Sequence, residues 1–248
     1  MRYFLQLSYD GTNYHGWQIQ PNAISVQEVL DKALSKLCGE PVYSLGCGRT
    51  DTGVHAKEFY AHFDTNKALD NKLIINLNGI LPDDVAAKRF IQVADDAHAR
   101  FDATLRAYEY HMHFRKDPFK KGYSYYFPYH KKPSVKLMNE AAALLLEVSD
   151  FASFNKAHAA SKTTICKVTR AEWIELDEYN IVFHISADRF LRNMVRAIVG
   201  TLIDVGNGKL SLEEFKNIIA SKNRSKAGTS VPGNGLYLTK IVYPYIHE

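Results

Sequence analysis

The chain has 248 residues, of which 46% are apolar and 23% charged, as in an ordinary soluble globular protein. This composition excludes a collagen, a coiled coil and an intrinsically disordered chain, and the length accommodates one or two domains. The formal net charge of +4 permits a polyanionic partner without requiring one.

Hydrophobic periodicity predicts three strands and one helix in the first 104 residues. The strands are expected at residues 4–9, 59–64 and 86–93, the second of them half-buried because apolar and polar residues alternate along it. The helix should begin after Ser25, which forms a capping box with Glu28, and end at Gly39.

The same alternation of strands and covering helices recurs from about residue 105. Strands are expected at residues 107–114, 163–176, 180–187 and 237–243. Helices are expected from Ser134 to Leu145, over residues 190–205, and after a second capping box at residues 211–214.

The order of these elements favours an α+β protein with a largely antiparallel sheet covered by helices, because strands close in sequence pair with their neighbours. No Pro-, Gly- or Ser-rich linker divides the chain. We therefore predict two related halves that share one sheet, residues 1–104 and residues 105–248, with the active-site cleft between them.

Cysteine usage indicates a reducing compartment. The three cysteines, Cys38, Cys47 and Cys166, include no pair at CxxC spacing, so neither a disulfide framework nor a structural zinc site is expected. No apolar stretch approaches the ~18 residues of a membrane span, and the alternating N-terminus does not resemble a signal peptide. We therefore expect a cytoplasmic protein with no membrane association.

The densest group of reactive side chains lies in residues 46–56, with the sequence GCGRTDTGVHA. Its glycines cost conformational entropy, which suits either a tight loop between strands or a loop that presents Asp51 to a ligand. Arg49 would project on the same side as Asp51 in an extended segment, and its charge would keep the carboxylate ionised. An ionised carboxylate can act as a nucleophile or a base.

The triplet Asp51-Thr52-Gly53 also occurs in aspartic proteases, which use two such aspartates that share one proton. This sequence has no second Asp-Thr-Gly or Asp-Ser-Gly triplet. An arginine beside the pair would also oppose the sharing of a proton. We therefore disfavour a protease.

Two aromatic stretches follow. Tyr108 stands at the start of a predicted strand, where it fits either a core position or a platform that stacks on a base. Residues 119–132 interleave aromatic with basic side chains, the composition of a surface that binds single-stranded RNA. A solvated loop with cross-strand aromatic pairs explains the same composition.

A basic stretch opens the helix predicted at residues 190–205. The spacing of Arg189, Arg192 and Arg196 would place them on one side of that helix, as a clamp for phosphate or carboxylate or as an ordinary solvated face. The sequence has neither a phosphate-binding loop motif nor a dinucleotide-binding glycine motif, and its histidines are scattered. We therefore expect no cofactor and no metal.

Taken in order, these motifs resemble the tRNA pseudouridine synthase A family, and the resemblance covers almost the whole chain. The segments that carry it are residues 48–56 (GRTDTGVHA), 9–20 (YDGTNYHGWQIQ), 25–27 (SVQ), 98–101 (HARF), 106–110 (RAYEY), 150–154 (DFASF), 194–196 (MVR) with Gly200, and 235–238 (GLYL). Two departures are visible: Thr52 stands where alanine is more usual, and residues 228–232 (GTSVP) differ from the usual pattern.

The resemblance implies a cofactor-free isomerase that converts uridine to pseudouridine at positions 38 to 40 of the tRNA anticodon stem-loop. It also implies a homodimer in which one tRNA contacts both subunits. Asp51 falls on the catalytic aspartate of the family, and Arg196 falls on the arginine that pairs with it. Arg49 falls on the arginine associated with flipping the nucleotide, and Tyr108 falls on the tyrosine that stacks on the target base.

The chemistry of pseudouridine formation suits these residues. A stacked base must first be flipped out, which costs a few kcal/mol, and contacts from arginines such as Arg49 and Arg192 to the RNA could offset that cost. The sequence leaves open whether Asp51 attacks C1′, attacks C6 or supports an elimination. A non-catalytic RNA-binding protein remains the alternative.

Overall fold

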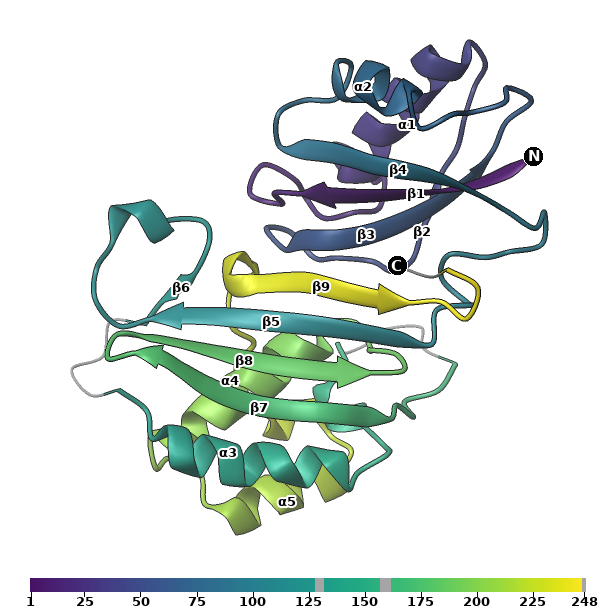
Figure 1. Ribbon diagram of the computed structural model, residues 1–248. Coiled ribbons are helices and arrows are strands. Elements are labelled where there is room, and N and C mark those ends of the chain that lie inside the picture. Colours follow the sequence, from purple (N-terminus) through teal and green to yellow (C-terminus); the bar gives the residue numbers. More distant parts are fainter. Residues whose placement is uncertain (128–131, 157–161, 247–248) are drawn as a thin grey trace. The chain divides into compact units, whose positions relative to one another are not determined.

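The computed structural model describes residues 1–127, 132–156 and 162–246, and its chain forms two compact units (Figure 1). The first unit comprises Met1–Thr104 and the segment from Tyr237 onward, and the second comprises Leu105–Leu236. The C-terminal strand therefore groups with the first unit, whereas the sequence placed all of residues 105–248 in one half. Within the described residues, no helix combines the length and apolar character that crossing a membrane demands.

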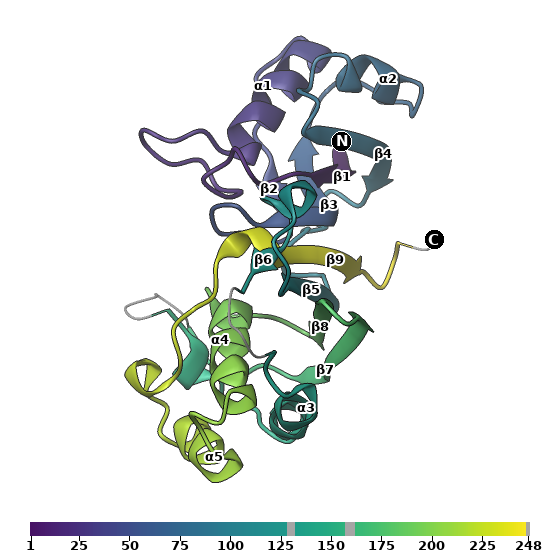
Figure 2. The ribbon, with the colours of Figure 1, turned by 90° about the vertical axis from the view of Figure 1, so that its left-hand side faces the viewer.

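The first unit is a mostly antiparallel sheet with two helices beside it (Figures 1 and 2). In this sheet β1 pairs with β4 on one side and with β3 on the other, β2 pairs with β3, and β9 runs parallel to β3. The elements are β1 (Arg2–Tyr9), α1 (Val26–Cys38), β2 (Leu45–Gly46), β3 (His55–Asp64), α2 (Leu73–Asn78), β4 (Val85–Val93) and β9 (Leu236–Val242).

Local capping explains the bounds of α1. The Ser25 hydroxyl accepts a hydrogen bond from the Glu28 backbone N–H at 3.3 Å, and Gly39 ends the helix at φ 76°, a left-handed conformation that glycine adopts without a Cβ penalty. The helix predicted from Ser25 to Gly39 is thereby confirmed.

The strand at residues 59–64 is longer and more buried than its alternating pattern predicts. It is part of β3, and Tyr60 and His62 are as buried as their apolar neighbours. The expectation of a half-buried strand is wrong because aromatic groups cover its second face. Tyr60 packs edge-on against Tyr243, and His62 packs against His98 at a centroid distance of 4.5 Å.

The second unit is a three-stranded antiparallel sheet in which β8 lies between β5 and β7, with the short β6 parallel to β5. Its longer helices gather on one face of this sheet (Figure 2). The elements are β5 (Leu105–His113), β6 (Tyr125–Tyr126), α3 (Val135–Ala143), β7 (Val168–Asp177), β8 (Asn180–Ala187), α4 (Met194–Gly206) and α5 (Leu212–Ala220).

Helix α4 begins four residues later than predicted, so Arg189 and Arg192 lie outside it and the expected stripe of three arginines on one helix face does not form. The cause is Asn193, which adopts φ 65° while its side-chain amide donates to the Ser230 hydroxyl at 2.6 Å. A left-handed residue cannot continue a right-handed helix.

The predicted strand at residues 163–176 also starts late, at Val168. The residues before it bind elsewhere: Cys166 N–H donates to the Ser149 carbonyl at 2.9 Å, and Ile165 forms an isolated bridge with Asp150. The other predicted elements are present within a few residues of their expected bounds. The α+β class, with largely antiparallel strands and covering helices, is confirmed.

Candidate active site

Asp51 lies in the loop between β2 and β3, where a tight turn fixes the backbone. The Asp51 carbonyl accepts from Val54 N–H at 3.1 Å, and Gly53 takes φ 74°. A positive φ at the third turn position strongly favours glycine. Asp51 is half-buried and Arg49 is exposed. The loop is therefore a tight connection between two strands that also leaves two charged side chains accessible to solvent.

An N-terminal segment, residues 11–17, braces the backbone on both sides of Asp51. A Cβ added at Gly11 would lie 2.0 Å from the Val54 carbonyl oxygen, and a Cβ added at Gly16 would lie 2.2 Å from the Thr50 carbonyl oxygen. Because no side chain fits at either approach, the two backbones pack directly against each other.

Hydrogen bonds tie the same two segments together. Trp17 N–H donates to the Thr50 carbonyl at 3.2 Å, and Gly53 N–H donates to the Tyr14 carbonyl at 3.3 Å. The hydroxyls of Tyr9 and Thr50 are 2.8 Å apart in a buried contact. The position of Asp51 is therefore set by backbone packing on residues 11–17 and by a buried polar contact to β1.

Beneath the loop, aromatic packing leaves little freedom. Trp17 stacks on Phe59 of β3 with ring centroids 4.2 Å apart, and a Cβ at Gly46 would lie 2.6 Å from the Trp17 ring. The buried His55 ring stacks on Tyr237 at 4.6 Å, and its Nδ1 lies 3.0 Å from an Asp10 carboxylate oxygen. These stacked aromatic pairs fix the residues that flank the loop.

Tyr108, on β5 of the second unit, is half-buried. Its ring meets that of Phe190 edge to face, with centroids 5.1 Å apart and an interplanar angle of 87°. Such an arrangement is the preferred one for aromatic pairs, and it fixes the plane of the Tyr108 ring.

Arg196 lies in the first turn of α4, and the segment 228–232 holds it. Its Nε donates to the Val231 carbonyl at 2.7 Å, and Val231 N–H donates back to the Arg196 carbonyl at 3.2 Å. A Cβ at Gly200 would lie 1.9 Å from the Thr229 carbonyl oxygen. Close approach of this segment to α4 therefore needs glycine at position 200 and orients the Arg196 side chain.

The same segment is anchored on β5. The buried Tyr110 hydroxyl donates to the Pro232 carbonyl at 2.8 Å, and burial raises the pKa of this phenol well above its ordinary value. Arg192 differs from Arg196: it is exposed in the turn before α4, and its carbonyl accepts from Lys156 N–H at 3.0 Å.

Comparison with known proteins decides the family. A family model described as tRNA pseudouridine synthase matches residues 141–244. A protein of Bacteroides fragilis named tRNA pseudouridine synthase A is 54% identical over 245 residues, which is 98% of this chain and 96% of that protein. Proteins of the same name from Bacteroides thetaiotaomicron (52%, 98% and 91%) and Porphyromonas gingivalis (49%, 98% and 97%) are similar over comparable lengths.

The chain belongs to the tRNA pseudouridine synthase family.

This membership confirms the resemblance drawn from the sequence motifs and sets the aspartic protease aside. The structure places Asp51 and Arg49 in one loop of the first unit, and Tyr108, Arg192 and Arg196 in the second unit. The pairing of Asp51 with Arg196 stays a prediction.

Sequence reasoning missed the positioning residues Gly11 and Gly16. A glycine-containing segment rich in aromatics was visible at residues 9–17, but no spacing rule connects it with a loop more than 30 residues away. Burial raises the pKa of the Cys166 thiol to about 11, which disfavours the reactive thiolate form of this residue. Among the described residues, no group of three His, Cys, Asp or Glu side chains could hold a metal ion.

Proposed function

We propose that this chain isomerises uridine to pseudouridine in tRNA, at positions 38 to 40 of the anticodon stem-loop, with Asp51 as the catalytic carboxylate. The observation that carries the proposal is 54% identity over 98% of the chain with a protein named tRNA pseudouridine synthase A. The braced loop supports the assignment of Asp51, because catalysis needs a group held in a fixed geometry.

The reaction needs no net oxidation or reduction. The bond between N1 of uracil and C1′ of the ribose breaks, a bond between C5 and C1′ forms, the C5 proton leaves and N1 gains a proton. Attack at C1′ and attack at C6 use Asp51 as a nucleophile, and elimination uses it as the base that takes a proton from C2′ and returns it when the new bond to C1′ forms.

Arg196 is proposed as the partner that keeps Asp51 ionised and oriented. A guanidinium presents a rigid fork of N–H donors that matches a carboxylate, and the bond from Nε to the Val231 carbonyl limits how this fork can turn. Arg49, exposed in the same loop as Asp51, is proposed to take part in flipping the target nucleotide.

Tyr108 is proposed to stack on the flipped base, with its ring plane set by Phe190. Base–aromatic stacking contributes about 1–3 kcal/mol, which helps to retain the detached base while it turns. Arg192 is exposed and is proposed to contact a phosphate of the RNA.

The assembly is proposed to be a cytoplasmic homodimer that binds one tRNA with both subunits. A chain of net charge +4 has a limited positive field, and a two-fold axis would double that charge along an extended RNA. Sedimentation at micromolar concentration tests this, since a fully active monomer contradicts it.

Release of tritium from tRNA labelled at C5 of uridine tests the proposed function directly. Wild-type protein should release it, and Asp51→Ala and Asp51→Asn should retain less than about a thousandth of the rate, since loss of a covalent catalyst costs many orders of magnitude. Both variants should bind tRNA almost as wild type does.

The exposed Asp83 of the same unit offers a matched control, and Asp83→Asn should be fully active. A wild-type protein that binds tRNA but releases no tritium would support the non-catalytic alternative. An active Asp51→Ala would leave the family reaction in place and remove Asp51 from it.

A further inference from the structure

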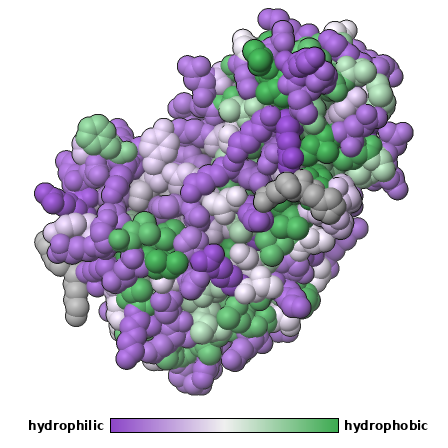
Figure 3. Space-filling view, viewed as in Figure 1, coloured by the Kyte–Doolittle hydropathy of each residue, from purple (hydrophilic) through white to green (hydrophobic). Residues whose placement is uncertain are grey.

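Phe119 is 90% exposed, more than any other large apolar side chain in the part of the chain that the structure describes. It lies in the short turn Pro118–Lys120 between β5 and β6, at an edge of the molecule whose surface is mostly hydrophilic (Figure 3). Burying this ring against a ligand would gain about 1.5–3 kcal/mol.

The turn that carries Phe119 is held in place by local bonds. The Asp117 carboxylate accepts from Phe119 N–H at 2.9 Å, and Pro118 restricts the backbone. Tyr123 and Ser124 N–H both donate to the Lys120 carbonyl, at 3.0 and 3.1 Å. The exposed ring therefore projects from an ordered turn.

Longer-range bonds fasten the turn to the rest of the second unit. The Ser124 hydroxyl lies 2.9 Å from His113 Nδ1, and its carbonyl accepts from the Asn234 side chain at 3.1 Å. Lys120 donates to the Asn180 side chain. A ligand that contacts Phe119 need not order the loop, which removes a large cost of binding.

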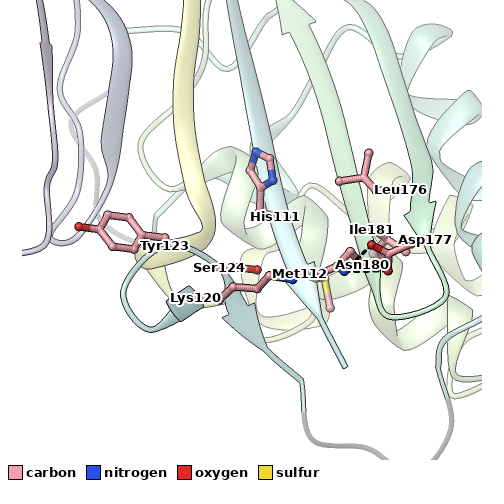
Figure 4. A pocket seen from close by; sticks show the side chains of 9 residues that line it. All are labelled: His111, Met112, Lys120, Tyr123, Ser124, Leu176, Asp177, Asn180 and Ile181. Atoms are coloured by element: carbon pink, nitrogen blue, oxygen red, sulfur yellow. Dashed lines mark hydrogen bonds between the residues drawn. The ribbon is translucent and has the colours of Figure 1, made fainter. Parts of the chain in front are cut away.

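A cavity of about 300 Å³ adjoins the turn, and Lys120, Tyr123 and Ser124 line one part of it. In Figure 4 Asn180 lies beside Asp177, and its amide donates to that carboxylate at 2.7 Å. Hydrogen bonds from the backbone of Tyr179 and from Asn180 lower the pKa of Asp177. The Asp177 and Asn180 side chains of the cavity are thus engaged with each other, and Phe119 is not among the residues that line it.

The charge of the segment around Phe119 favours a polyanionic partner. Residues 115–121 contain four basic residues and one acidic residue. Lys116 and Lys121 are exposed on either side of Phe119, and no ion pair to either is found within the described residues. Aromatic rings flanked by cations bind single-stranded nucleic acid, whereas lysine is depleted from protein–protein interfaces. An RNA therefore fits this surface better than a protein does.

Tyr108 lies within β5, whereas Phe119 lies in the turn Pro118–Lys120 that follows this strand. Both residues belong to the second unit, and the five-residue interval from Tyr108 to His113 along β5 spans about 17 Å. Figure 1 shows the turn to one side of the end of β5, next to β6.

We propose that Phe119 stacks on an unpaired base of the tRNA other than the target uridine, while Lys116 and Lys121 contact the flanking phosphates. This inference rests on the proposed function, because it takes tRNA as the substrate.

Binding of tRNA to Phe119 variants tests the inference. Phe119→Ala and Phe119→Leu should each raise the tRNA dissociation constant about 5- to 100-fold, with turnover at saturating tRNA unchanged. Phe119→Trp should keep wild-type affinity, and its emission should be quenched by tRNA. The native Trp17 and Trp173 are 2% and 3% exposed, so a wild-type titration gives the background. Tyr43→Ala, which removes a side chain that is 78% exposed, is the control and should bind normally.

Each other result overturns the inference in a distinguishable way. Equal affinity of Phe119→Ala and wild type removes Phe119 from the RNA surface, while wild-type tritium release keeps the proposed function intact. If Phe119→Leu binds tRNA as tightly as wild type does, the contact of Phe119 with RNA is apolar and does not involve stacking on a base. A change in sedimentation of Phe119→Ala assigns the ring to an interface between copies. Wild-type protein that does not bind tRNA overturns both proposals.

Discussion

Replacing Gly16 by alanine should lower kcat far more than the same replacement at Gly39, a glycine with a similar backbone conformation. Gly16 has φ 87° and Gly39 has φ 76°, so alanine at either position carries the left-handed penalty of about 1–2 kcal/mol. A Cβ at Gly39 meets nothing within 4 Å, whereas a Cβ at Gly16 lies 2.2 Å from the Thr50 carbonyl oxygen. Gly39→Ala is therefore a matched control.

The clash sets the size of the effect. Relieving it requires a retreat of about 1 Å by one of the two backbones, and such overpacking costs a further 1–3 kcal/mol or so. The free energy of unfolding should fall by about 2–5 kcal/mol in Gly16→Ala and by about 1–2 kcal/mol in Gly39→Ala, as urea titration would measure.

Turnover should separate the two variants more clearly than stability does. Thr50 precedes Asp51, so a retreat of about 1 Å displaces the carboxylate and should lower kcat about 100-fold. Gly39→Ala should keep its kcat in the tritium-release assay at a temperature where both variants are folded. If Gly16→Ala turns over as fast as Gly39→Ala, residues 11–17 do not position Asp51.

Three further outcomes are expected. Tyr108→Phe should bind tRNA as wild type does, whereas Tyr108→Ala should bind about 5- to 100-fold more weakly in a filter-binding titration. Arg196→Lys should lower kcat far more than tRNA affinity, because lysine keeps the charge but loses the two-pronged geometry that orients a carboxylate; a kcat equal to that of wild type would mean that Arg196 does not orient Asp51. Burial lowers the pKa of His62 from 6.5 to about 4. Because the unfolded chain then binds a proton at this residue more tightly than the folded chain does, protonation favours unfolding. The contribution of His62 to the free energy of unfolding is therefore complete above pH 6.5 and is lost as the pH falls toward 4. Thermal unfolding of His62→Gln should show a weaker pH dependence in that window.

Elements set by local chemistry could be predicted from the sequence. The helix α1 begins at a capping serine, ends at a left-handed glycine and repeats its apolar residues at helical spacing, so all of its determinants lie within fifteen residues. The same holds for α5, where Ser211 and Glu214 form the full capping box.

Features set by distant contacts could not be predicted. The start of α4 depends on the bond from Asn193 to Ser230, 37 residues away. The burial of β3 on its second face depends on Tyr243, close to the C-terminus. The candidate nucleophile was visible because glycine, arginine and aspartate cluster in one short loop, but its bracing by Gly11 and Gly16 is a tertiary contact that leaves no periodic signal.

The hold on Arg196 has a consequence for how the sequence can change over evolution. Both bonds between Arg196 and residue 231 involve main-chain atoms of that residue, and almost every amino acid supplies the same carbonyl and N–H. These two bonds therefore place no demand on the side chain at position 231, where the buried valine answers to core packing instead, and the unusual GTSVP segment keeps its hold on Arg196. Proline is the exception, since it has no N–H to give.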